Sequence, residues 1–225
     1  MKDLIAEFRW RGFLSQTTSD DVAEFLLSER RTMYVGFDPT AASLHLGSLV
    51  PVMGLAHAQR HGHRPIALVG GGTGLIGDPR PTAERTLNTR ETVAEWVEKL
   101  GAQAARFLSF EGDNAARMVN NLDWTKDVSV LEFLRDVGKY ITVNSMVAKD
   151  SVRARMEDRA SGISYAEFSY QLLQGYDFSY LKQHYNCDLQ IGATDQWGNI
   201  TVGTELTRKK YGATVWGLVL PLLVK

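Results

Sequence analysis

The sequence predicts an α/β fold, a Rossmann-like parallel sheet with helices on both faces and a mostly helical insertion. Segments typical of strands and helices alternate along the 225 residues, as in parallel strands joined by crossover helices. Residues 65–69 are uniformly apolar, which is typical of a strand buried on both faces. Glycine or polar residues follow the strand-like segments at 32–37, 65–69 and 189–191, at the carboxyl strand ends where such sheets bind ligands.

Local patterns place the elements in order. Asp20 and Asp21 suit the first turn of one helix, and Asp38-Pro39 ends a strand. We expect strands at 32–37, 65–69, 189–191 and 215–220. We expect helices at 2–10, 19–29, 46–60, 88–100, 164–174, 177–185 and 196–209, with a break near Gly175 and a mostly helical stretch from 107 to 158.

Composition excludes several classes of protein. The 25 Lys and Arg and 26 Asp and Glu give a formal net charge of -1, so no strong field would hold nucleic acid non-specifically. The single cysteine, Cys187, allows no intramolecular disulfide and favours a reducing compartment. No apolar leader opens the chain, and the longest apolar run, 216–224, is too short to span a bilayer. We expect a cytoplasmic protein with no membrane partner.

The first cluster of candidate functional residues lies at the carboxyl end of the strand at 32–37. Strand periodicity puts Tyr34, Gly36 and Asp38 on one face, where they would form a polar pocket wall. His45 and Ser48 follow where the next helix begins, and a helix start offers free N–H groups and a positive dipole end to an anion. A half-buried strand followed by a capped helix explains the same pattern, so the pattern alone leaves both interpretations open.

A glycine-rich loop follows the strand at 65–69. Residues 72–77 formally match the dinucleotide fingerprint G-x-G-x-x-G, but Pro79 and Pro81 follow before any helix can form. The match therefore fails on context, and a nucleotide-dependent oxidoreductase is disfavoured. What remains is a loop whose backbone can approach a ligand closely and that carries Asp78 as a carboxylate.

Two further clusters lie near the carboxyl end of the chain. Tyr170, Gln174 and Asp177 are spaced to share one helix face, although a polar stripe of this kind is also typical of a solvated face. Asp195, at the start of a helix, is either an N-cap or an acceptor for ribose hydroxyls. His57 and His61 lie four residues apart without a third ligand nearby in sequence, so we predict no metal site.

Together these segments resemble the catalytic domain of bacterial tyrosyl-tRNA synthetases, which are class I aminoacyl-tRNA synthetases. The likeness runs from about Tyr34 to the end of the chain. Residues 39–48, with His45-Leu-Gly47, resemble the family's first signature, HIGH. Tyr-x-Gly-x-Asp-Pro-Thr at 34–40 and Tyr-x-x-x-Gln-Gly-Tyr-Asp at 170–177 separate the chain from the related tryptophan enzymes.

The resemblance implies a homodimer that activates L-tyrosine with ATP to tyrosyl-adenylate and transfers it to tRNA(Tyr), releasing AMP and diphosphate. ATP would be a substrate, with Mg²⁺, and no tightly bound cofactor is implied. The implied tyrosine-binding residues are Tyr34, Asp78, Tyr170, Gln174 and Asp177. The implied ATP- and adenylate-binding residues are Gly36, Asp38, Pro39, His45, Gly47, Ser48, Gly192, Asp195 and Gln196. The implied catalytic residues are Thr40, His45 and Arg85.

Three positions depart from the family's pattern. Ser48 stands where a histidine or asparagine is usual, and Ala193 replaces a frequent glycine. After Asp78 the family's lysines are missing, which leaves Arg80 and Arg85 as the nearby cations. None of these changes touches the residues that would bind tyrosine.

The family continues beyond position 225 into a lysine-rich second signature, an anticodon-recognising helical domain and an RNA-binding module. We therefore expect residues 1–225 to be a catalytic domain, with its helical insertion at about 107–160, cut before that second signature. We expect this part alone to have impaired activity. A non-catalytic fragment that binds tyrosine or dimerises is the alternative. Tyrosine-dependent exchange of pyrophosphate into ATP separates the two, because only the catalytic form would exchange.

Overall fold

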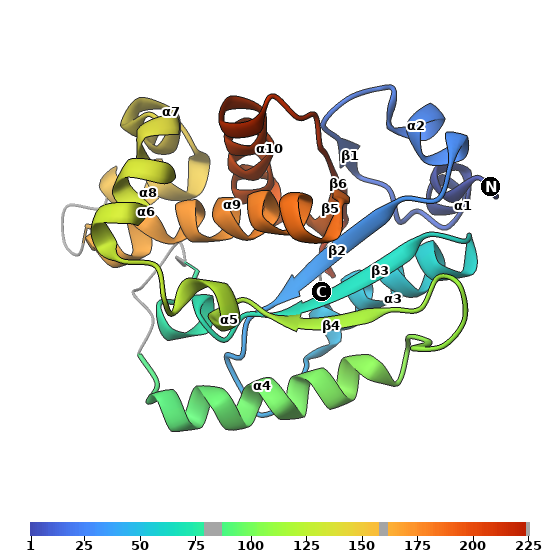
Figure 1. The fold of residues 1–225 in the computed structure, drawn as a ribbon, viewed down its shortest axis with the longest axis horizontal. Helices are drawn as coiled ribbons and strands as arrows, with labels where there is room; N and C mark the ends of the chain where they lie inside the picture. Colours follow the sequence, from blue (N-terminus) through green and yellow to red (C-terminus); the bar gives the residue numbers. More distant parts are fainter. Residues whose placement is uncertain (79–86, 158–161, 224–225) are drawn as a thin grey trace.

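The computed structural model describes residues 1–78, 87–157 and 162–223. Within them, six strands form one sheet in the order β1-β6-β5-β2-β3-β4 (Figure 1). Five strands are parallel, namely β2 (Thr32–Phe37), β3 (Arg64–Val69), β4 (Arg117–Asn120), β5 (Cys187–Ala193) and β6 (Trp216–Leu220). The short β1 (Gln16–Thr17) pairs antiparallel with β6 at the edge. The predicted α/β class with a parallel sheet is confirmed, with one antiparallel edge strand added.

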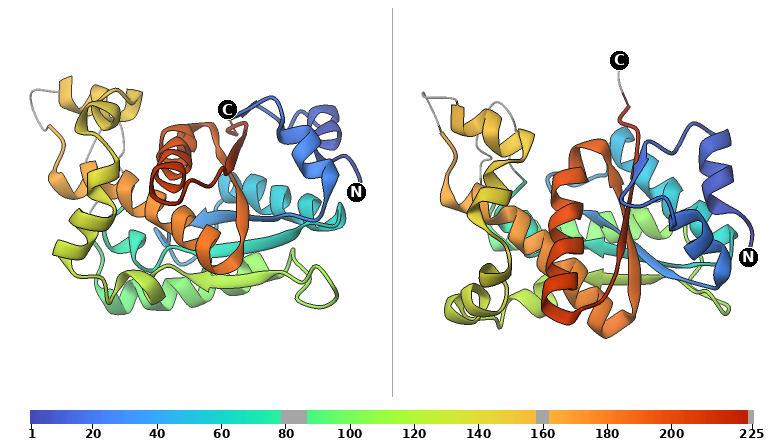
Figure 2. Two further views of the ribbon diagram at one scale, coloured as in Figure 1. Left: turned by 45° about the horizontal axis from the view of Figure 1, so that its top comes forward. Right: turned by 90° about the horizontal axis from the view of Figure 1, so that it is seen from above.

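Helices cover both faces of the sheet. One layer contains α3 (Leu46–Arg60) and α4 (Arg90–Ala105), and the other contains α9 (Tyr165–Tyr185) and α10 (Trp197–Tyr211) (Figure 1 and Figure 2). The remaining helices are α1 (Leu4–Trp10), α2 (Val22–Ser28), α5 (Leu122–Thr125), α6 (Val130–Asp136), α7 (Val143–Val147) and α8 (Asp150–Glu157), with short 3₁₀ turns η1 (Thr73–Leu75), η2 (Gly138–Tyr140) and η3 (Thr194–Gln196).

The two-residue period of β2 sorts its side chains between the two layers. Val35 and Phe37 join the core cluster that includes Leu55 of α3. Tyr34 points the other way and packs with Phe178 of α9, their ring centroids 5.3 Å apart. Burying a large apolar side chain of this kind contributes about 1.5–3 kcal/mol. The alternation expected from the sequence is confirmed, and it places Tyr34 on the α9 side of the sheet.

The expected helix break near Gly175 is wrong, because α9 runs unbroken through that position. Gly175 serves packing instead. A Cβ built there would lie 2.8 Å from Cγ1 of Val202 on α10, and one built at Gly203 of α10 would lie 2.8 Å from Cδ1 of Phe178. The two glycines therefore let α9 and α10 approach closely, and this contact sets how the face carrying Tyr170, Gln174 and Asp177 meets the sheet.

The stretch at 107–158, expected to be mostly helical, also contains β4. This strand is parallel to β3, with Ile66 opposite Arg117. It was missed because it is only four residues long and half-buried at the sheet edge, without strict alternation. β1 was missed for a related reason: two residues carry no periodicity, and their pairing with Val219 and Leu218 is visible only in three dimensions.

No helix in the described part of the chain is long and apolar enough to cross a membrane.

A substitution at Gly175 tests the close approach of the two helices. We expect Gly175→Ala to lower the free energy of unfolding by about 1–3 kcal/mol, because the added methyl group must displace the stiff Val202 side chain. Urea denaturation monitored by circular dichroism measures the change. Gly101→Ala in α4 is the matched control, since the nearest atoms to its Cβ lie at 3.9 Å, and it should stabilise the chain by about 0.5–1 kcal/mol. Equal effects in the two variants would contradict the packing role of Gly175.

Candidate functional site

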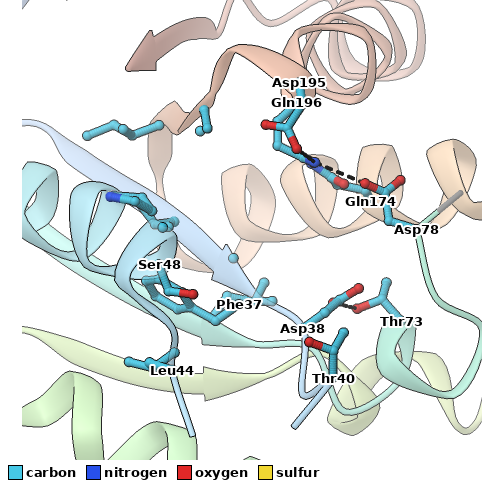
Figure 3. Close-up of a pocket in the computed structure, with 18 of the residues that line it drawn as sticks. Phe37, Asp38, Thr40, Leu44, Ser48, Thr73, Asp78, Gln174, Asp195 and Gln196 are labelled. Atoms are coloured by element: carbon cyan, nitrogen blue, oxygen red, sulfur yellow. Dashed lines mark hydrogen bonds between the residues drawn. The ribbon is translucent and has the colours of Figure 1, made fainter. Parts of the chain in front are cut away.

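A cavity of about 260 Å³ opens at the carboxyl ends of β2, β3 and β5 (Figure 3). Most of the residues singled out from the sequence line it, namely Tyr34, Gly36, Asp38, Thr40, His45, Gly47, Ser48, Asp78, Tyr170, Gln174, Asp177, Gly192, Asp195 and Gln196. Pro39 is not among the lining residues. Arg85 lies outside the described residues. The four sequence clusters thus meet at one site.

Asp38 joins three elements at the end of β2. Its Oδ2 accepts a hydrogen bond of 2.7 Å from the Tyr170 hydroxyl of α9, and its Oδ1 accepts one of 2.7 Å from the Thr73 hydroxyl of η1. Figure 3 shows the hydrogen bond between Asp38 and Thr73 beyond the carboxyl end of β2. Hydrogen bonds to a charged carboxylate are stronger than neutral ones. The two hydrogen bonds of Asp38 therefore fix the positions of the glycine loop and of α9 relative to the sheet.

The glycines after β3 make room for this polar cluster. A Cβ at Gly70 would lie 2.2 Å from Oδ1 of Asp38, and one at Gly71 would lie 2.3 Å from Oδ1 of Asn120. A Cβ at Gly74 would lie 2.6 Å from Cγ of Pro39, so Pro39 packs directly against the loop at Gly74. The close approach of protein side chains explains why these three positions are glycine. A dinucleotide-binding role for the loop is therefore not needed to explain them.

Asp177 lines the cavity and is buried, with 2 % of its surface exposed. The Asn121 amide donates to its Oδ2 at 2.9 Å, and the Trp124 indole N–H donates to its Oδ1 at 2.9 Å. Burial raises the pKa of Asp177 to about 7, although both hydrogen bonds oppose that shift. Neither Asn121 nor Trp124 could be found from the sequence, because nothing in the local pattern indicates that α5 packs against α9.

Two buried polar atoms in the lining lack a partner among the described residues, the Tyr34 hydroxyl and the Gln190 side-chain oxygen. Burial, and next the nearby charge of Asp177, raise the pKa of Tyr34 well above its usual value, so the hydroxyl keeps its proton and can donate it to a ligand. Buried polar groups normally have partners, so two orphans in one cavity favour a polar ligand. Gln190 was not among the candidate residues, although its position on β5 faces the same cavity.

Asp78 faces Gln196 across the cavity mouth. Gln196 donates to Oδ2 of Asp78 at 2.9 Å and Asn199 donates to Oδ1 at 3.2 Å, and Figure 3 shows the Gln196 contact. Burial raises the pKa of Asp78 to about 6. Asp195 lies in η3 and is exposed, and Gln196 occupies the N-cap of α10. Of the two interpretations of Asp195, the N-cap of α10 is therefore wrong.

His45 occupies the N-cap of α3. Its Nδ1 accepts a hydrogen bond of 3.2 Å from the backbone N–H of Ser48, which holds the ring against the first turn. A Cβ at Gly47 would lie 3.0 Å from that ring, so a larger residue at position 47 would crowd the imidazole. The first turn of α3 lines the cavity, and its positive dipole end would stabilise an anionic group bound there.

The charges that line the cavity are of one sign. Four aspartates face it, namely Asp38, Asp78, Asp177 and Asp195, and no Lys or Arg lines it within the described ranges. Such a lining favours a ligand that carries a cationic group as well as polar atoms. No group of three or more His, Cys, Asp or Glu side chains that could hold a metal ion occurs in the parts of the chain that the structure covers.

Comparison with known proteins identifies the family of the chain. The family model described as tRNA synthetases class I (W and Y) matches residues 27–225. The chain belongs to this family.

Two curated relatives within the family are tyrosine–tRNA ligases. The chain is 56% identical to the tyrosine–tRNA ligase of Streptomyces coelicolor over 100% of its own length and 54% of that protein, and 54% identical to that of Chromobacterium violaceum over 99% and 53%. This member of the synthetase family thus spans about half the length of the curated relatives it matches.

Solved structures of the family share the fold. A C-terminally truncated mitochondrial tyrosyl-tRNA synthetase of Aspergillus nidulans superposes with a TM-score of 0.89 at 28% identity, covering 100% of this chain and 70% of that one. The tyrosyl-tRNA synthetase of Archaeoglobus fulgidus complexed with L-tyrosine superposes at 0.72 and 20% identity, covering 99% and 65%, and shows likeness of fold alone. The Rossmann-like sheet is therefore that of this synthetase family.

Removing Asn121 tests the inner hydrogen-bond network. We expect Asn121→Ala to lower the free energy of unfolding by about 2–4 kcal/mol, since its amide serves Asp177, Thr73 and the Gly72 backbone at once. Chemical denaturation measures the loss. Asn144→Ala, at an exposed position of α7, is the control and should change stability by less than about 0.5 kcal/mol. Equal stability of Asn121→Ala and the wild type would contradict the network.

Proposed function

We propose that the chain is the amino-terminal catalytic part of a tyrosine–tRNA ligase of the cytoplasm. It activates L-tyrosine with ATP to tyrosyl-adenylate, releasing diphosphate, for transfer to tRNA(Tyr) with release of AMP. One observation carries the proposal: the buried Tyr34 hydroxyl, without a partner among the described residues, lines the same cavity as the buried Asp177 carboxylate.

This pair suits a phenol. Tyr34 would donate its O–H to the phenol oxygen, and the phenol would donate its own proton to Asp177, whose oxygens are already oriented by Asn121 and Trp124. Phenylalanine would leave both protein groups unpaired, at a loss of about 1–3 kcal/mol for each. Tyrosine would therefore be selected by the hydrogen bonds that phenylalanine cannot make.

The rest of the amino acid would be held nearer the cavity mouth. Asp78, Tyr170 and Gln174 line the same cavity as Asp177 and Gln196, and the family resemblance assigns them to the substrate ammonium. The four aspartates of the lining support this assignment, because carboxylates attract an ammonium group. The carboxylate of tyrosine would then point toward the first turn of α3.

ATP would bind across the strand ends, with its phosphates at α3. The tyrosine carboxylate attacks the α-phosphorus, a new P–O bond forms, and the bond to diphosphate breaks. His45 and Thr40 would stabilise the charge that develops on the phosphates. The nucleotide and ribose would lie against Gly36, Asp38, Gly47, Ser48, Gly192, Asp195 and Gln196, with Pro39 behind them. Mg²⁺ would enter with ATP, and Arg85 would act from outside the described residues.

We also propose that two copies of the chain form a homodimer through one apolar surface, here called the α6 surface. It consists of exposed residues of α6, α7 and the start of α9, namely Val130 (74% exposed), Leu131 (80%), Leu134 (45%), Val143 (61%) and Tyr165 (70%). These helices pack around one core cluster at one end of the molecule (Figure 1). Exposed apolar residues gathered in this way favour a protein partner.

Pyrophosphate exchange combined with binding tests the proposed activity. We expect tyrosine-dependent exchange of pyrophosphate into ATP by the wild-type protein, and we expect Asp177→Ala to lose most of the preference for tyrosine over phenylalanine while the fold survives. Calorimetric titration of both amino acids measures that preference, and circular dichroism checks the fold. Undiminished preference for tyrosine in Asp177→Ala would overturn the assignment of the phenol site. Tight tyrosine binding with near-zero exchange would favour the non-catalytic fragment instead.

A charge placed on the α6 surface tests the dimer. We expect Leu131→Asp to shift the chain toward monomers in sedimentation velocity, because two carboxylates would be buried in a symmetric interface. Leu27→Asp, on α2 at the other end of the molecule, is the matched control and should sediment as the wild type does. A wild-type chain that is monomeric at micromolar concentration would contradict the homodimer.

A further inference from the structure

Three aromatic rings form a stack that leads from the surface to Asp177. The ring of Tyr180 lies on the indole of Trp124, with centroids 4.5 Å apart and planes 13° from parallel. The imidazole of His184 lies on Tyr180, with centroids 4.0 Å apart and planes 23° from parallel. Tyr180 and His184 lie one turn apart on α9, so one helix supplies both outer rings.

The inner ring of the stack, Trp124, is the one that contacts the candidate phenol-binding site. Trp124 is 7% exposed and donates its indole N–H to Asp177 at 2.9 Å. A hydrogen bond of this kind weakens steeply as its angle departs from linear. Any rotation of the indole therefore changes how firmly that carboxylate is oriented. The stacked face of Tyr180 opposes such a rotation from the side nearest the solvent.

The outer two rings do not touch the cavity. Neither Tyr180 nor His184 is among its lining residues, Tyr180 is half-buried, and His184 is exposed. Tyr180 also meets Tyr176 edge-on, with centroids 6.3 Å apart, which fixes the tilt of its ring. The stacked indole of Trp124 links the Tyr180 ring to the Asp177 carboxylate.

We propose that Tyr180, covered by His184, is a positioning residue for the choice of amino acid: its ring holds the Trp124 indole so that the N–H stays directed at the Asp177 carboxylate. This role rests on the proposed function, since it requires the phenol of tyrosine to donate to Asp177. It predicts a defect confined to the phenol hydroxyl, because phenylalanine has no atom that needs that carboxylate.

Calorimetric titration of the 225-residue chain with L-tyrosine and L-phenylalanine tests the role of Tyr180. Tyr180→Leu keeps an apolar cover and removes the ring. It should raise the Kd for tyrosine about three- to tenfold and leave that for phenylalanine unchanged, so that selectivity falls. Tyr180→Phe keeps the stacked ring and should restore the wild-type selectivity. His184→Ala, at an exposed position that does not endanger folding, should lower selectivity about two- to threefold by uncovering Tyr180.

Tyr185→Leu is the matched control. Tyr185 is on the same helix and its ring lies against the Arg117 guanidinium. It has no ring stacking with Trp124 among the described residues, so the variant should keep the wild-type ratio of the two Kd values. Equal losses for both amino acids in Tyr180→Leu, or unchanged selectivity in both Tyr180→Leu and His184→Ala, would overturn the positioning role. A wild-type chain that does not bind tyrosine would instead overturn the proposed function, which keeps the two failures distinct.

Discussion

A single network of side-chain hydrogen bonds determines the geometry of the candidate site. It runs from Tyr170 to Asp38, from Asp38 to Thr73, from Thr73 to Asn121, and from Asn121 to Asp177. Its members come from α9, β2, η1 and the end of β4, so it connects four elements that are distant in sequence. Such networks are stabilising only when their buried members are satisfied, which makes this part of the fold intolerant of small changes.

Two glycines, Gly70 and Gly175, follow from that constraint and from helix packing respectively. Gly70 is glycine because Asp38 and Thr73 occupy the space of a side chain, and Gly175 is glycine because α10 crosses α9 there. Neither position has a positive φ, so the requirement is space and not backbone conformation. The glycine loop therefore helps to shape a ligand cavity through its effect on Asp38, without any direct contact with a phosphate being needed.

Most of the fold could be predicted from local sequence. The bounds of β2 and α3 agree with the expected segments 32–37 and 46–60, because a turn signal ends one and apolar periodicity marks the other. The continuity of α9 through Gly175 and the edge strands β1 and β4 could not be predicted, since each depends on a partner distant in sequence. The candidate site divides in the same way. Tyr34 and Asp177 follow from motifs, but Asn121, Trp124 and Tyr180 are visible only once α5 lies against α9.

The orientation of tyrosine in the cavity shows whether Tyr34 and Asp177 bind its phenol, and a crystal structure of the chain with L-tyrosine would measure that orientation. We expect the phenol oxygen to lie within about 3 Å of both the Tyr34 hydroxyl and an Asp177 oxygen, with the ammonium near Asp78, Tyr170 and Gln174. Tyrosine bound in the reverse orientation, with its ammonium at Asp177, or bound outside this cavity, would contradict it.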